Sequence, residues 1–145
     1  MKFSSPRQLK DWISNAAKDN NQIANTILQN YMMERLLERI SISKYKDNFI
    51  LKGGFLIAAM IGINMRSTLD MDTTVKGLSV SKEKIEVILN EIVSIDLNDG
   101  IILKFINAKS IHDVSEYDDF RISIEAQFYT IKVNMKIDIT TGDVI

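Results

Sequence analysis

The chain has 145 residues, enough for one domain with its own hydrophobic core and too few for two. Hydrophobic residues make up 46% and charged residues 26%, a composition typical of a folded globular domain rather than of a disordered chain. The formal net charge is −1, so a nucleic-acid partner would need a local cluster of Lys and Arg, because affinity for phosphates comes from such clusters.

Several classes of site and location are excluded by the same composition. Without cysteine there are no disulfides and no thiolate metal sites, which is typical of proteins in the reducing cytoplasm. No apolar run approaches the roughly 20 residues of a membrane span, and MKFSSPRQLKDW lacks the apolar core of a secretory signal. We therefore expect a cytoplasmic protein. The one histidine, His112, lies in a polar stretch typical of a solvated loop, so any catalysis would depend on carboxylates.

The first third of the chain is predicted to be helical. A short helix is expected over about 6–18, because Pro6 follows two serines and this order is typical of a helix start. Apolar residues then recur at spacings of three and four over 20–43, which predicts a long amphipathic helix. A short strand over 48–51, a Gly-Gly turn and an apolar helix over about 54–61 follow.

The rest of the chain alternates between strand and helix patterns. In TLDMDTTVK, residues 68–76, polar and apolar residues alternate strictly, so Asp70 and Asp72 are expected to share one face of a strand. An amphipathic helix is predicted within 79–95. Three strands are then expected, with alternation that places Asp138 on the polar face of the last one, over 100–111, 120–130 and 131–139.

This order of elements predicts an α+β fold, a mixed sheet of about five strands with the N-terminal helices packed on it. The whole chain, 1–145, is expected to form a single domain. Within it, the N-terminal helices occupy about 1–46 and the sheet with its further helices about 47–145.

Three features together indicate chemistry at phosphorus. A helix that starts at Gly53-Gly54 offers free backbone N–H groups and a positive dipole end to a phosphate. Asp70 and Asp72 could hold Mg²⁺, which prefers oxygen ligands, and Asp138 could complete a second metal site. Each feature alone is more often a tight turn or a solvated strand face, so the indication lies in their combination.

The run FILKGGFLIAAMIGINMRSTLDMDTTVKG resembles the DNA polymerase β-like nucleotidyltransferase superfamily, which has a Gly-rich turn, a D-x-D strand and a third Asp on a later strand. More narrowly, the chain is similar to the AbiEii group, toxins of type IV toxin–antitoxin and abortive-infection systems. The motifs that carry this resemblance are LKGG, R-x-T-x-D-x-D, F-R-I and K-I-D-I-x-x-G-D, which stand here at 51–54, 66–72, 120–122 and 136–143.

The resemblance implies roles for individual residues. Asp70, Asp72 and Asp138 would be the catalytic carboxylates and would hold Mg²⁺ or Mn²⁺, with Asp138 helping to activate an acceptor hydroxyl. An NTP would be the substrate. The residues that the resemblance implies for nucleotide and phosphate contacts are Gly53, Gly54, Arg66, Thr68 and Arg121.

The implied reaction is transfer of NMP from an NTP to an acceptor hydroxyl. The implied acceptor is RNA, tRNA in particular. The resemblance also implies a cognate antitoxin, which need not form a stable complex with the chain. Family members continue into a helical C-terminal half that is absent here, so a natural short protein, a decayed gene and a cut fragment all stay open.

Two alternatives follow: an inactive remnant that still folds and binds nucleotide, and a small-molecule nucleotidyltransferase acting on antibiotics, with Glu125 as its acidic contact. A truncated sheet edge at strand 131–139 would also predict self-association through that strand.

Overall fold

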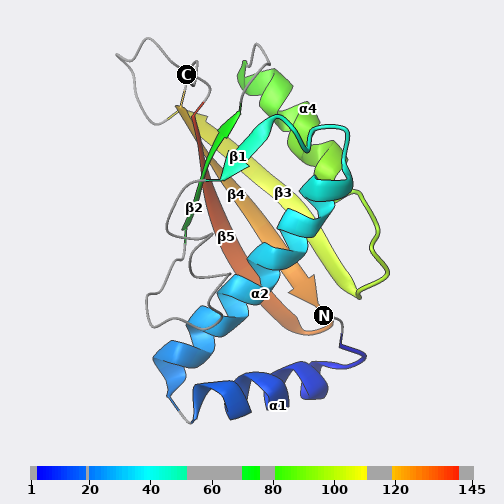
Figure 1. The fold of residues 1–145 in the computed structure, drawn as a ribbon, viewed down its shortest axis with the longest axis vertical. Helices are drawn as coiled ribbons and strands as arrows, with labels where there is room; N and C mark the ends of the chain where they lie inside the picture. Colours follow the sequence, from blue (N-terminus) through cyan, green and yellow to red (C-terminus); the bar gives the residue numbers. More distant parts are fainter. Residues whose placement is uncertain (1–2, 19, 52–69, 76–80, 111–118, 141–145) are drawn as a thin grey trace.

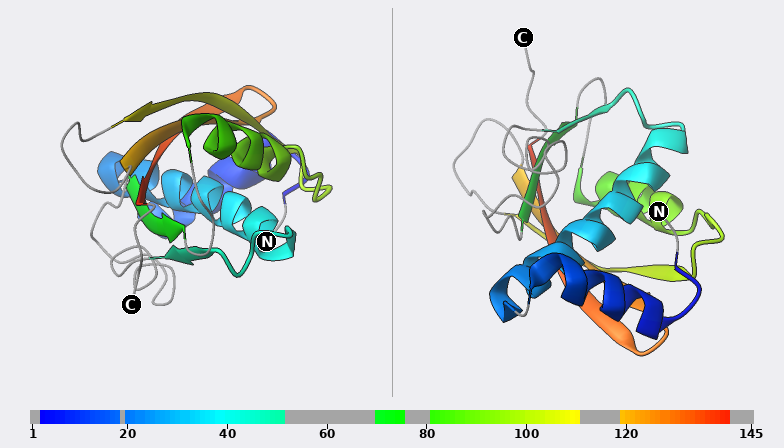
Figure 2. Two further views of the ribbon diagram at one scale, coloured as in Figure 1. Left: turned by 90° about the horizontal axis from the view of Figure 1, so that it is seen from above. Right: turned by 60° about the horizontal axis from the view of Figure 1, so that its bottom comes forward.

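The structure is a computed structural model that describes residues 3–18, 20–51, 70–75, 81–110 and 119–140. The three described helices lie on one side of a five-stranded sheet (Figures 1 and 2). The elements are α1 (Pro6–Ala17), α2 (Asn21–Ile42), β1 (Phe49–Leu51), β2 (Asp70–Val75), α4 (Lys82–Val93), β3 (Ile101–Ser110), β4 (Asp119–Phe128) and β5 (Ile131–Thr140).

The α+β class, the mixed sheet and the packing of the N-terminal helices on it are confirmed. The predicted helix over 54–61 and the predicted loop around His112 lie outside the described residues. None of the described helices is long and apolar enough to cross a membrane.

The sheet has the strand order β1-β2-β5-β4-β3. Three long strands, β3, β4 and β5, pair antiparallel in sequence order, and β2 then pairs parallel to β5. The last strand is therefore central, with hydrogen-bonded neighbours on both sides. The prediction that strand 131–139 is a truncated sheet edge is wrong, because alternation identifies the faces of a strand but not its neighbours. Self-association of the chain stays a prediction, without this edge as its route. The edges of the described sheet are β1 and β3.

Local sequence signals explain where the helices begin. The Ser5 hydroxyl accepts a hydrogen bond from the N–H of Gln8 at 3.2 Å, and Pro6 takes the first helical position of α1. At the start of α2 the Asn20 side chain accepts the N–H groups of Gln22 and Ile23 at 3.0 and 3.1 Å. Ser81 caps α4 in the same way. These caps confirm the three predicted starts.

The alternating strands separate the two faces of the sheet. On β4 and β5 every second side chain is buried against the helices, and the residues between them are half-buried or exposed on the opposite face. All three described helices lie on the same side of the sheet (Figure 2), so no described helix covers this second face, called here the open face. The buried side chains of the two strands are Phe120, Ile122, Ile124, Ala126, Phe128, Val133, Met135, Ile137 and Ile139.

A buried ionic cluster joins α2 to the connection between α4 and β3. The Nη2 and Nη1 groups of Arg39 donate to Oδ1 and Oδ2 of Asp99 at 3.0 and 3.1 Å, and Arg35 lies 3.5 Å from the same carboxylate. Arg39 also donates to the backbone carbonyls of Ile95 and Ile101 at 2.9 and 3.1 Å. The Asp99 side chain is fully buried. These contacts fix the start of β3 to α2.

The arginines also determine the ionisation of Asp99. Burial alone would raise the pKa of this carboxyl, but hydrogen bonds from Arg39 and from the N–H of Ile101, together with the charges of Arg39 and Arg35, bring the pKa below its ordinary value. Asp99 therefore remains ionised inside the fold and serves as the counter-ion of two buried guanidinium groups.

Replacing Asp99 with Asn is expected to lower the free energy of unfolding by about 3 kcal/mol, because removal of one partner leaves buried charge without a counter-ion. Urea unfolding measures the change. Asp96→Asn is the matched control: Asp96 is exposed in the same connection, and its Oδ1 accepts the N–H of Asn98, which Asn can also do. Equal stability of the two variants would contradict the assignment.

The pH dependence of this difference follows from the lowered pKa. The stabilisation from ionised Asp99 is fully present above its ordinary pKa of 3.8 and is lost as the pH falls from there toward the lower folded-state pKa. The gap in unfolding free energy between wild type and Asp99→Asn should thus be constant between about pH 7 and 5 and shrink below about pH 3.8. Urea titrations across this range provide the measurement, and a gap that widens in acid would contradict it.

Candidate functional site

The parallel pairing of β2 with β5 places three acidic positions together. Asp72 is the register partner of Asp138, and Asp70 is the partner of Lys136. Paired positions lie on the same face of a sheet, and neighbouring strands are about 4.8 Å apart. Asp138 alternates with the buried Ile137 and Ile139, so this face is the open one. Asp138, on the adjacent strand, thus shares the face on which Asp70 and Asp72 are predicted to lie.

Basic residues continue the same row across the sheet. Arg121 on β4 is the register partner of Asp138, and Lys109 on β3 is the partner of Arg121. Nε of Arg121 donates to Oδ1 of Asp138 at 2.8 Å, and Nη2 donates to Oδ2 at 3.1 Å. The Asp138 side chain is 25% exposed and that of Arg121 44%, so the pair remains open to solvent.

The position of Lys109 depends on a β-bulge that the sequence pattern does not predict. The register of β3 shifts between Phe105 and Asn107. Before the shift the odd-numbered residues of β3 face the helices, whereas after it Ala108 is buried and Lys109 is exposed. Sequence reasoning did not select Lys109, because strict alternation from the first half of the strand assigns it to the buried face.

The row sets two acidic positions directly opposite each other. Like charges directly opposite each other on neighbouring strands destabilise a sheet, and Asp72 and Asp138 hold such positions. Three carboxylates on one face are a donor set that fits Mg²⁺, since this ion takes oxygen ligands. Among the side chains that the structure describes, no group of three or more His, Asp or Glu could hold a metal ion. A metal centre at Asp138 would therefore need Asp70 and Asp72, whose positions follow from the strand register.

The other predicted site residues cannot be placed. Gly53, Gly54, Arg66 and Thr68 lie outside the described residues. The chain leaves β1 at Leu51, whose register partner is Thr73 on β2. Leu51, the last described residue before the predicted Gly-Gly turn, thus lies on the strand next to β2.

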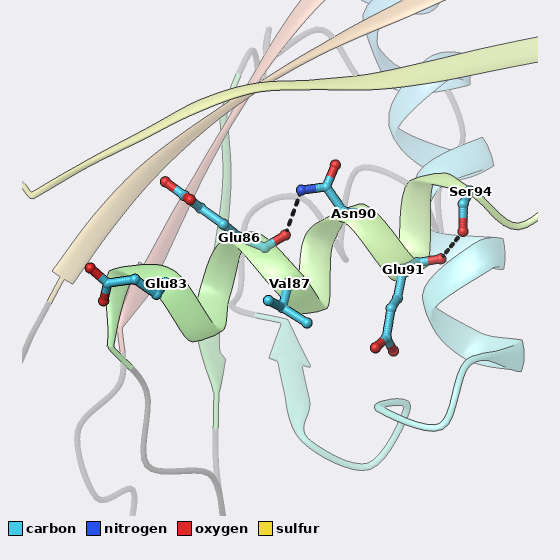
Figure 3. Close-up of a pocket in the computed structure, with 6 residues that line it drawn as sticks. All are labelled: Glu83, Glu86, Val87, Asn90, Glu91 and Ser94. Atoms are coloured by element: carbon cyan, nitrogen blue, oxygen red, sulfur yellow. Dashed lines mark hydrogen bonds between the residues drawn. The ribbon is translucent and has the colours of Figure 1, made fainter.

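A concave surface away from these residues lies on α4 and is shown in Figure 3. Asn90 and Ser94 donate to the backbone carbonyls of Glu86 and Glu91 at 2.8 and 2.7 Å, so these polar groups are satisfied within the helix. The carboxylates of Glu86 and Glu91 point in different directions (Figure 3), and the latter accepts the Tyr45 hydroxyl at 2.8 Å. This hollow has the character of a solvated helix surface.

A family model described as "Nucleotidyl transferase AbiEii toxin, Type IV TA system" matches residues 35–145, more than half of the chain. No curated protein matches at a significant level.

Two solved structures from Helicobacter pylori resemble the chain in part. The protein JHP933 is 15% identical to this chain, with a TM-score of 0.47. The match covers 87% of this chain and 47% of JHP933. A protein named as a candidate nucleotidyltransferase is 16% identical with a TM-score of 0.46, over 87% of this chain and 48% of its own. The chain thus spans about half the length of each. Likeness at this level supports no conclusion about chemistry.

The crowding of acidic positions predicts that the site costs stability. With metal ions removed by a chelator, Asp72→Asn should raise the free energy of unfolding by roughly 0.5 kcal/mol, because it removes a like charge opposite Asp138. Glu125→Gln is the control, since Glu125 lies on the same face opposite Lys104, a favourable partner, and its replacement should be neutral or destabilising. Chemical denaturation measures both, and a less stable Asp72→Asn would contradict the repulsion.

Proposed function

We propose, because the chain belongs to the AbiEii family of nucleotidyl transferase toxins, that its open face transfers a nucleoside monophosphate from an NTP to an acceptor hydroxyl. The observation that carries the proposal is the parallel register that sets Asp72 opposite Asp138, with Asp70 two residues along the same strand. In the reaction the acceptor oxygen bonds to the α-phosphorus, the bond from that phosphorus to the β-phosphate oxygen breaks, and pyrophosphate leaves.

Asp70, Asp72 and Asp138 are the residues that would hold Mg²⁺ or Mn²⁺. When bound, the ion would supply neutralisation of the charge that develops on the phosphoryl oxygens. Asp138 is the carboxylate proposed to take the proton of the acceptor hydroxyl at one of its Oδ atoms. Its place on a central strand supports this role, because hydrogen bonding on both sides fixes its backbone.

Cations on the open face would orient the triphosphate. Arg121 and Lys136 occupy positions next to the acidic residues, where their positive charge favours phosphate. Backbone N–H groups at Gly53 and Gly54, and the side chains of Arg66 and Thr68, are proposed as further phosphate or nucleotide contacts. Chemistry of this kind depends on positioning and charge neutralisation and needs no protein nucleophile.

An RNA acceptor, tRNA in particular, is proposed from the family. A nucleic-acid partner of a chain with net charge −1 requires a local basic cluster, and we assign this role to the exposed lysines of the open face. Its exposed lysines are Lys104, Lys109, Lys132 and Lys136. The proposed setting is a toxin–antitoxin system in the cytoplasm, where NTPs and RNA are available, with an antitoxin that need not form a stable complex.

The two alternatives are addressed by the same face. A small-molecule transferase would need acidic residues free to meet a cationic acceptor, but the register partner of Glu125 on β3 is Lys104. An inactive remnant would keep the fold, with or without nucleotide binding, and would not transfer NMP.

Calorimetric titration of the chain with each of the four NTPs and Mg²⁺ tests the proposal. We expect binding that requires the metal and is lost in Asp70→Asn and Asp72→Asn, because each variant removes one of the negative charges that attract the cation. Asp11→Asn, an exposed carboxylate on α1, should bind as wild type does. A folded wild-type chain that binds none of the NTPs would favour the inactive remnant. Binding would justify transfer assays with labelled NTP and pooled RNA.

A further inference from the structure

Arg121 engages the whole carboxylate of Asp138. Two parallel N–H donors of the guanidinium meet the two carboxylate oxygens, at 2.8 and 3.1 Å, in the fork geometry that is the strongest Arg–carboxylate arrangement. The two residues are register partners on strands that are paired over their whole length. The pair is therefore set by the sheet and is no chance contact between long surface side chains.

The same carboxylate is needed by the proposed metal centre. A cation held between Asp72 and Asp138 would draw on the same carboxylate charge that both donors of Arg121 already engage. Strong binding by either partner takes electron density from the carboxylate and orients it away from the other partner. Metal and guanidinium are thus alternative counter-ions of one carboxylate.

We propose that Arg121 is a positioning residue that competes with the catalytic metal for Asp138 and weakens metal binding until nucleotide arrives. This inference rests on the proposed function. An incoming triphosphate offers the guanidinium an alternative partner to Asp138, since its fork fits phosphate oxygens as well as carboxylate oxygens. Nucleotide then takes Arg121, metal takes Asp138, and each promotes binding of the other.

The size of the effect follows from the exposure of the pair. Because Arg121 is 44% and Asp138 25% exposed, the ion pair is screened by solvent and its loss on metal binding costs only a modest amount. Metal affinity in the absence of nucleotide should therefore be lowered about fivefold by Arg121. An effect of this size favours binding of metal and nucleotide together without preventing either.

Direct Mn²⁺ titration without nucleotide, followed by the electron paramagnetic resonance signal of free Mn²⁺, tests the competition. Arg121→Gln should bind Mn²⁺ about fivefold more tightly than wild type. Arg121→Lys keeps the charge but cannot form the fork, so its affinity should lie between the two. Lys109→Gln is the matched control, because it removes the same charge from the same row without an ion pair to Asp138, and should change the affinity less than twofold.

A second titration in the presence of a non-hydrolysable NTP tests the coupling. Wild type should gain Mn²⁺ affinity on addition of the nucleotide, and Arg121→Gln should gain less, because its carboxylate is already free. Thermal melting confirms that each variant is folded.

The outcomes separate the two proposals. Mn²⁺ binding that is unchanged or weaker in Arg121→Gln overturns the competition and leaves the metal site standing. Absence of Mn²⁺ binding in folded wild type, or binding that Asp138→Asn leaves unchanged, overturns the proposed metal centre and the competition with it.

Discussion

The parallel pairing of β2 with β5 is the constraint on which the candidate site depends. These strands are distant in sequence, with α4, β3 and β4 between them, and only their register brings Asp72 opposite Asp138. A slip of one residue would turn the acidic positions of β2 toward the helices, because successive side chains point to opposite faces. Correct chemistry at the open face therefore requires correct pairing in the sheet.

The helix side of the sheet specifies that pairing. Ile137 and Ile139 are buried against the helices, so β5 cannot rotate without exposing apolar surface. The ion cluster of Arg39 and Asp99 adds a polar constraint, since it joins α2 to the start of β3 and leaves few alternative positions for the outer strand. The covered face thereby supplies the rigidity on which the open face relies.

The sequence predicts faces better than neighbours. Alternation and caps are local signals, and they identified the described helices, the strands and the polar facing of Asp138. The order of strands is a long-range property, so the central place of β5 and the pairing of Asp138 with Arg121 could not be derived from spacing. The bulge that exposes Lys109 interrupts the alternation on which the prediction depends. Asp99 was missed because a charged residue in the turn LNDG is ordinarily solvated.

Two Arg–Asp pairs among the described residues are bidentate, Arg39 with Asp99 through Nη1 and Nη2 and Arg121 with Asp138 through Nε and Nη2, and burial distinguishes their roles. The Asp99 carboxylate is fully buried and saturated by Arg39, Arg35 and a backbone N–H, so no ligand can reach it without unfolding its surroundings. The Asp138 carboxylate is partly exposed, lies opposite Asp72 in the strand register, and has a guanidinium partner that is itself accessible to solvent. An ion pair held inside the core stabilises the fold, whereas one on a solvent-accessible face is only weakly held and leaves its carboxylate available to other cations.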